Sequence, residues 1–175
     1  YVKFNEALKH FKDVNFEIIW RPFQLNPNMP KEGMNRDEYL NKKFGGREQA
    51  LKVYKNIEDE GKLANIHFQF KKIKITPNSF LSHKLLAFAF NKQQQNEVLE
   101  AIFFHYFIEG KNIGNLEIII EIAKQTNLYE EGIEKYLLSE KDNENLLNEA
   151  KQASDIGISG VPCFIFNNKF VVNGA

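Results

Sequence analysis

The stretch that decides the fold lies close to the end of the chain, at residues 160–174, and reads GVPCFIFNNKFVVNG. Two short runs rich in β-branched and aromatic residues flank Asn167-Asn168, a pair that tolerates positive φ. This pattern predicts a β-hairpin that opens with Val161-Pro162.

Val161-Pro162 has two interpretations. A proline at the first position of a strand forgoes one ladder donor and is tolerated there, so the pair can mark no more than a strand start. Alternatively, the peptide bond is cis and turns the chain abruptly, which leaves the backbone of Val161 free for an extended ligand. The hairpin sequence alone does not separate the two.

The composition predicts a folded protein without a strong electrostatic partner preference. The chain has 175 residues, is 43% hydrophobic and contains 16 Phe, so it can bury a core as one domain, or as one domain carrying an insertion. Lysine plus arginine equals aspartate plus glutamate at 23 each. Because the formal net charge is zero, we expect neither a nucleic acid nor a membrane as partner.

The cysteine content, the hydropathy and the histidine spacing limit which disulfides, membrane segments and metal sites the chain can have. Cys163 is the one cysteine and cannot form an intramolecular disulfide. No apolar run reaches bilayer length, and no signal peptide is visible, so we expect a soluble cytoplasmic protein, with a periplasmic location left open. His10, His67, His83 and His105 have no ligand spacing and no acidic partner pattern, so no metal site is predicted.

Upstream of the hairpin, the pattern changes from mixed to helical. Residues 2–11 have helical spacing, residues 16–23 are β-rich, and a Pro/Asn-rich loop follows at residues 24–31. From residue 35 to about residue 156 the pattern is almost wholly helical, interrupted by an alternating extended segment at residues 66–75. Seven helices are expected there. The start signals are Asn78 or Ser79, Asn115, and a Ser139/Asp142 capping box.

This order predicts an α/β domain interrupted by an all-helical insertion. We assign residues 1–34 and 146–175 to the α/β domain and residues 35–145 to the insertion.

Five collinear motifs give the chain a specific resemblance to a known family. They are WRPFQLNP at residues 20–27, YL with KFG at 39–45, TPNS at 76–79 with His83, FIEG with IG at 107–114, and GVP at 160–162 with NGA at 173–175. Together they resemble the FrnE-like branch of the DsbA family. The resemblance covers nearly the whole chain.

The resemblance implies a thioredoxin-like fold with a large helical insertion. It also implies a Cys-x-x-Cys pair at the start of the first helix, which we expect upstream of Lys3, so no catalytic residue lies in the sequence shown. The first strand and the last helix of the family are also absent from these 175 residues. We expect a trimmed sequence rather than a protein that lacks these parts.

The resemblance also suggests substrate-binding residues. Val161 and Pro162 would hold an extended substrate, and Asn26 with Pro27 would border the cleft. His83 falls where the family often places a histidine facing the cleft, although a core or surface role is equally compatible. Cys163 is expected to be a small core residue; the alternative is a resolving or regulatory thiol.

Three functions remain open on the sequence. The first is a FrnE-like thiol-disulfide oxidoreductase or isomerase that acts on protein or small thiols, as a monomer or homodimer, without a cofactor. The second resembles 2-hydroxychromene-2-carboxylate isomerases and kappa glutathione transferases and would use glutathione as co-substrate. The third is a redox-inactive binding module. The Asn-Gly-Ala ending favours the first.

Overall fold

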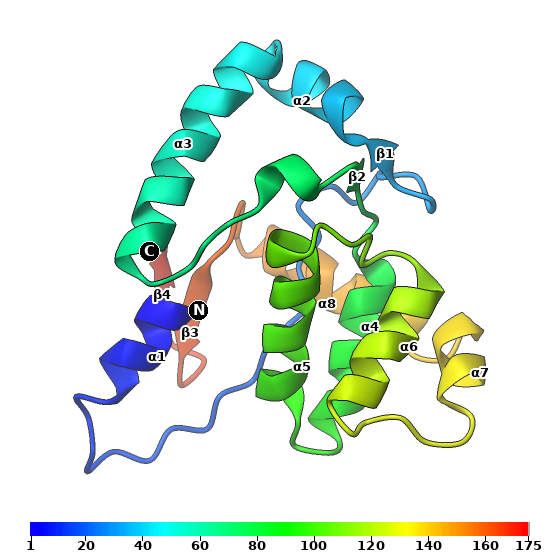
Figure 1. Cartoon of the computed structure of the whole chain (residues 1–175). Coiled ribbons are helices and arrows are strands. Elements are labelled where there is room, and N and C mark those ends of the chain that lie inside the picture. The colour runs from blue at the N-terminus through cyan, green and yellow to red at the C-terminus, as the bar shows by residue number, and fades with distance from the viewer. Residues whose placement is uncertain (175) are drawn as a thin grey trace.

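The protein is largely helical, with two small antiparallel pairs of strands. A computed structural model describes residues 1–174, so Ala175, the last residue of the Asn-Gly-Ala ending, lies outside the described residues. In Figure 1, α4 to α7 lie together, α2 and α3 form an arm, and α1 lies with the β3–β4 hairpin. The elements are α1 (Val2–Leu8), β1 (Met34–Asn35), α2 (Arg36–Phe44), α3 (Arg47–Leu63), η1 (Phe70–Lys72), β2 (Ile75–Thr76), α4 (Phe80–Phe90), α5 (Gln95–Phe103), η2 (Phe104–Ile108), α6 (Leu116–Gln125), α7 (Ile133–Leu138), α8 (Asn143–Asp155), β3 (Cys163–Phe166) and β4 (Phe170–Asn173).

The predicted hairpin is confirmed. Strand β3 pairs antiparallel with β4, with Cys163 opposite Asn173 and Phe166 opposite Phe170. The turn between them contains Asn167 at φ 51° and Asn168 at φ 55°, the left-handed region that asparagine tolerates better than most residues. The sequence of the turn therefore fixes the register of the hairpin locally.

The main core lies between α4, α5, α6 and α7, inside the predicted insertion. Its most buried side chains follow the helical spacing that the sequence predicted, because each helix turns one apolar face inward. They include Leu85, Val98, Ile119, Ile122, Ile133 and Leu137. Trp20 packs against this core from the N-terminal segment and donates a hydrogen bond from Nε1 to Asn96 Oδ1 at 2.7 Å. The domain limits stay a prediction.

The fourth predicted helix is interrupted. Helix α5 ends at Phe103 and continues as one π-helical turn, η2, before Gly110 at φ +75°. A Cβ on Gly110 would lie 2.6 Å from the carbonyl carbon of Lys72, next to η1. Glycine is therefore required at position 110 for two reasons. The backbone is left-handed there, and the η1 segment approaches too closely to leave room for a Cβ.

Two of the predicted helix starts are confirmed and one is wrong. Asn115 Oδ1 accepts from the Glu117 N–H at 2.8 Å, and Asn78 Oδ1 accepts from the Phe80 N–H at 2.9 Å. The Ser139/Asp142 capping box does not form. Ser139 is instead the C-cap of α7, where its Oγ donates to the Tyr136 carbonyl at 2.7 Å.

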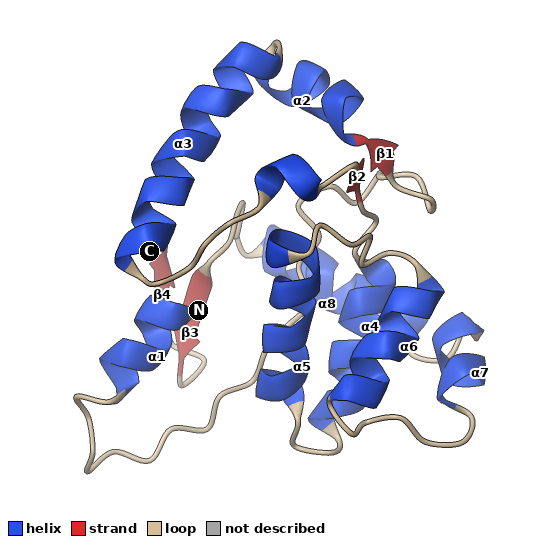
Figure 2. Ribbon diagram, viewed as in Figure 1, coloured by secondary structure: helices blue, strands red, loops and turns tan. Residues whose placement is uncertain are grey.

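The strand predicted at residues 16–23 is also wrong, as Figure 2 shows by the long loop between α1 and β1. Among the described residues, no strand pairs with this segment. The side chain of Gln95 substitutes for a strand neighbour at one point: its Oε1 accepts from the Trp20 N–H at 3.0 Å, and its Nε2 donates to the Trp20 carbonyl at 3.1 Å.

The extended segment predicted at residues 66–75 is confirmed only at its end. It forms the single turn η1 and then β2, in which Ile75 and Thr76 pair antiparallel with β1. No helix among residues 1–174 is both long and apolar enough to cross a membrane.

Gln95 gives a first test of the tertiary structure. It is buried, and Nε2 also donates to the Leu86 carbonyl at 3.1 Å. We expect Gln95→Leu to lower the free energy of unfolding by about 2 kcal/mol, because three backbone groups lose their partner. Equilibrium urea denaturation measures this. The exposed Gln152 on α8 provides the control: Gln152→Leu should change little, and equal effects of both variants would contradict the role of Gln95.

Candidate functional site

Two exposed residues, Val161 and Pro162, form the approach to β3, with a bend in the chain at Val161. The Val161–Pro162 peptide bond is cis, and both residues are exposed. The Pro162 carbonyl accepts a hydrogen bond from the Gly174 N–H at 2.9 Å, which ties the approach to the end of β4. Among residues 1–174, Val161 has no hydrogen-bond partner for its N–H or its carbonyl. These two groups can therefore bind an extended chain.

Cys163 follows immediately and is half-buried. It is the first residue of β3 and pairs with Asn173. Among residues 1–174 it is the one cysteine, and its thiol is free.

The loop that carries Asn26 and Pro27 is anchored to the start of α4. Asn78 Nδ2 donates to the Met29 carbonyl at 2.8 Å, and Gln24 Nε2 contacts Asn78 Oδ1 at 3.4 Å. Asn26 itself points to α2, where its Nδ2 donates to the Tyr39 hydroxyl at 3.3 Å, whereas Pro27 is exposed. The asparagine that starts α4 thus also fixes the loop.

His83 lies one turn into α4, near the same loop. Its Nε2 is 3.3 Å from Ser79 Oγ, and its buried Nδ1 has no partner at hydrogen-bonding geometry within residues 1–174. Burial lowers the pKa of His83 to about 4, and a backbone contact with Phe23 opposes part of that shift. At neutral pH the imidazole is therefore uncharged.

The structure brings together only part of the predicted set. The loop that carries Asn26 contacts the start of α4 through Gln24 and Met29, and its neighbour Phe23 contacts His83, whereas the Asn26 side chain bonds Tyr39 on α2. Among the described residues, Val161 and Pro162 form no hydrogen bond with Asn26, Pro27 or His83. A cavity of about 290 Å³ between the end of α3 and residues 66–71 contains none of the predicted residues.

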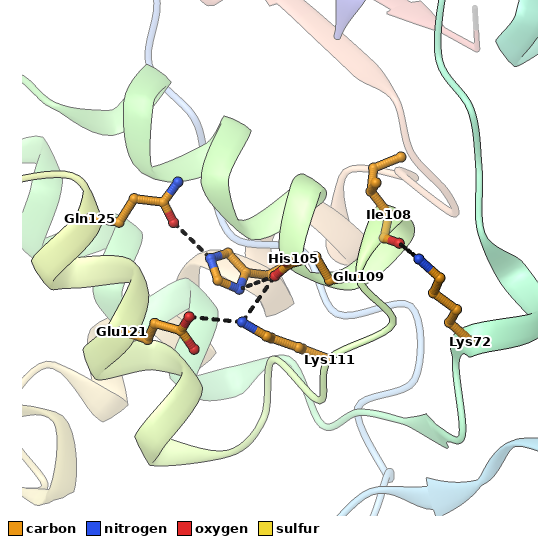
Figure 3. A network of polar contacts seen from close by, with 7 residues as sticks. All are labelled: Lys72, His105, Ile108, Glu109, Lys111, Glu121 and Gln125. Carbon is orange, nitrogen blue, oxygen red and sulfur yellow. Dashed lines mark hydrogen bonds and ion pairs between the residues drawn. The ribbon is translucent and has the colours of Figure 1, made fainter.

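A polar network that was not predicted from the sequence surrounds η2 (Figure 3). His105 is buried, with Nε2 2.8 Å from Gln125 Oε1 and Nδ1 3.1 Å from Glu109 Oε2. Lys111 Nζ bridges Glu109 at 3.0 Å and Glu121 at 2.8 Å. The interpretation that no histidine has an acidic partner is therefore wrong for His105, and its spacing of four residues from Glu109 was the available signal.

In this network the Lys111 ammonium group lies between the carboxylates of Glu109 and Glu121. Hydrogen bonds to Glu121 and Glu109 raise the pKa of Lys111, and the bond to Lys111 lowers the pKa of Glu121. Within the described part of the chain, no group of three or more histidine, cysteine, aspartate or glutamate side chains is placed to hold a metal. The network stabilises the turn between η2 and α6.

Comparisons with known proteins identify related chains. The family model described as "DSBA-like thioredoxin domain" matches residues 2–175. The chain is 23% identical over 176 residues to the uncharacterized protein YwbO of Bacillus subtilis (strain 168), covering 98% of this chain and 81% of YwbO. It superimposes with a TM-score of 0.88 and 22% identity on a probable DsbA oxidoreductase from Streptomyces coelicolor, over 99% of this chain and 76% of that one. The predicted thioredoxin-like fold class is thereby confirmed.

Proposed function

Because the chain belongs to the DSBA-like thioredoxin domain family, we propose that the protein is a thiol-disulfide oxidoreductase of the FrnE-like type. Its substrates would be protein or small-molecule thiols and disulfides. The observation that carries the proposal is the exposed start of β3, where the backbone N–H and carbonyl of Val161 have no partner among residues 1–174. An extended substrate strand can pair with these two groups.

The chemistry needs a pair of thiols, which we assign to a Cys-x-x-Cys motif of the full-length protein. One thiolate attacks the substrate disulfide, forms a mixed disulfide and releases one substrate thiolate, which takes up a proton. The second cysteine thiolate then displaces the other substrate sulfur, so the substrate is reduced to a dithiol and the enzyme pair is oxidised to a disulfide. In this reaction Val161 binds and orients the substrate backbone.

The test is dithiothreitol-dependent reduction of insulin by the full-length natural protein. We expect the protein to accelerate the precipitation of insulin chains over dithiothreitol alone. A full-length protein with an intact Cys-x-x-Cys pair and a rate no higher than that of dithiothreitol alone would overturn the proposal.

Cys163 is not expected to take part in this cycle. It is half-buried at the first position of β3, which limits the access of a substrate disulfide to its thiol. We therefore expect Cys163→Ser to leave the rate of insulin reduction unchanged. A loss of activity in a variant that still unfolds at the wild-type urea concentration would assign the resolving role to Cys163.

A further inference from the structure

A half-buried arginine without an acidic partner lies where α2, α3, β2 and η2 meet. Arg36 Nη2 donates to the Tyr54 hydroxyl at 2.6 Å. Arg36 Nη1 donates to Thr76 Oγ1 at 3.0 Å and reaches the Tyr106 hydroxyl at 3.5 Å. Its guanidinium carbon lies 5.7 Å from the ring centroid of Tyr39 and 5.1 Å from that of Tyr54. Hydroxyl oxygens and aromatic faces therefore form the surroundings of this cation.

The cluster has more hydrogen-bond donors than acceptors. A guanidinium carries five N–H donors, and the contacts above use three of them. The hydroxyls of Tyr54 and Tyr106 each accept from Arg36, and among the described residues neither of their own hydrogens has a partner within this cluster. Burial raises the pKa of Tyr106 to about 12, although Arg36 opposes the shift, so Tyr106 keeps its hydrogen at neutral pH.

A second cation extends the cluster along α2. Lys43 Nζ donates to the Tyr39 hydroxyl at 2.9 Å, and Asn26 Nδ2 donates to the same oxygen at 3.3 Å. Arg36, Tyr39 and Lys43 are spaced three and four residues apart and so share one face of α2. The Tyr39 hydroxyl, which already accepts twice, can only donate further.

Within the described residues, no carboxylate pairs with either of these cations. Arg36 and Lys43 form no ion pair with a carboxylate in the described part of the chain, whereas the neighbouring Lys42 pairs with Glu38 at 2.7 Å. A partly buried guanidinium is normally matched by a carboxylate or phosphate, because the charge-assisted hydrogen bonds offset its loss of hydration. The hydroxyl groups of Tyr39, Tyr54 and Tyr106 accept in the contacts above, and each also carries a hydrogen that such an acceptor can receive.

We propose that Arg36, Lys43 and the hydroxyls of Tyr39, Tyr54 and Tyr106 form a binding site for the oxyanion group of a small acid, either a carboxylate or a phosphate. Guanidinium and carboxylate or phosphate are geometrically matched, and the tyrosine hydroxyls supply further donors to the same oxygens. The proposal does not depend on thiol chemistry.

Isothermal titration calorimetry of the full-length protein tests the site, with inorganic phosphate and succinate as separate probes and sodium chloride at matched ionic strength as background. We expect saturable binding of at least one probe. Arg36→Gln should weaken it at least about tenfold, and Lys43→Gln about threefold, as expected for the loss of a charge-assisted contact. Binding of phosphate alone identifies a phosphate ester as the ligand class, and binding of succinate alone identifies a carboxylic acid.

Matched variants make the result specific. Arg21 is exposed and pairs with Glu149 at 3.2 Å, so Arg21→Gln is the control for Arg36→Gln, and Lys42→Gln is the control for Lys43→Gln. Lys43 is exposed, so its replacement keeps the test valid if Arg36→Gln fails to fold. No saturable binding of either probe to the wild type, or equal weakening by Lys42→Gln and Lys43→Gln, would overturn the proposal. Because no turnover is measured, neither result bears on the oxidoreductase function.

Discussion

Replacing Gly110 with alanine is expected to lower the free energy of unfolding by about 3 kcal/mol, through a left-handed backbone strain and a backbone clash that add together. Gly110 has φ +75°, and its new Cβ would lie 2.6 Å from the Lys72 carbonyl carbon and 2.8 Å from the Lys72 carbonyl oxygen. Because the obstacle is backbone rather than a flexible side chain, η1 and the end of η2 must separate. Equilibrium urea denaturation of the variant measures the loss.

Gly45 separates the two causes. It also lies in the left-handed region, at φ +73°, but a Cβ there would meet nothing within 4 Å. Gly45→Ala should therefore cost only the conformational part, about 1 kcal/mol. Equal losses for Gly45→Ala and Gly110→Ala would show that the contact between Gly110 and Lys72 contributes nothing.

Acidification is expected to destabilise the protein through His83. The pKa of His83 is lowered from 6.5 to about 4 in the folded state, chiefly by burial. Between these two pH values the unfolded chain binds a proton that the folded protein does not, so stability is fully present above pH 6.5 and falls as the pH approaches 4. The expected contribution is about 3 kcal/mol over this range.

His83→Gln isolates this contribution, because every carboxylate in the chain titrates equally in both proteins. The free energy of unfolding, measured by urea denaturation at several pH values, should fall less steeply with acid in His83→Gln than in the wild type. His10 is exposed, so His10→Gln should keep the wild-type slope. Identical slopes for His83→Gln and the wild type would contradict the burial of an uncharged imidazole.

Local signals in the sequence were sufficient for the hairpin and for most helices. Asn167-Asn168 takes positive φ in the structure, and Asn115 accepts from the Glu117 N–H, because both effects depend only on residues nearby in the chain. The segment at residues 16–23 failed as a strand because pairing needs a neighbour that local sequence does not specify. The partner of the Trp20 backbone is a side chain, that of Gln95, which is 75 residues away in the sequence.

The site could be predicted only in part for the same reason. Family motifs indicate Asn26 and His83; the structure places His83 in the first turn of α4 and turns the Asn26 side chain to Tyr39 on α2. The environment of Arg36 depends on α2, α3, β2 and η2 together, so no window of sequence contains it. Lys84 is a similar case: it is 1% exposed and donates to the Ser139 carbonyl over the Tyr136 ring, although lysine alone predicts a solvated position.

The π-helical turn η2 also constrains how this chain tolerates changes in length. A π turn accommodates one residue more than an α-helical turn, while the flanking helix keeps its course. Deleting a single residue within Phe104–Ile108 is therefore expected to restore an ordinary α-helical turn and to leave the phase of the residues that follow unchanged. A single codon deletion at this point should therefore preserve the ion pairs of Lys111 with Glu109 and Glu121, whereas one inside α5 would turn the residues that follow by about 100°.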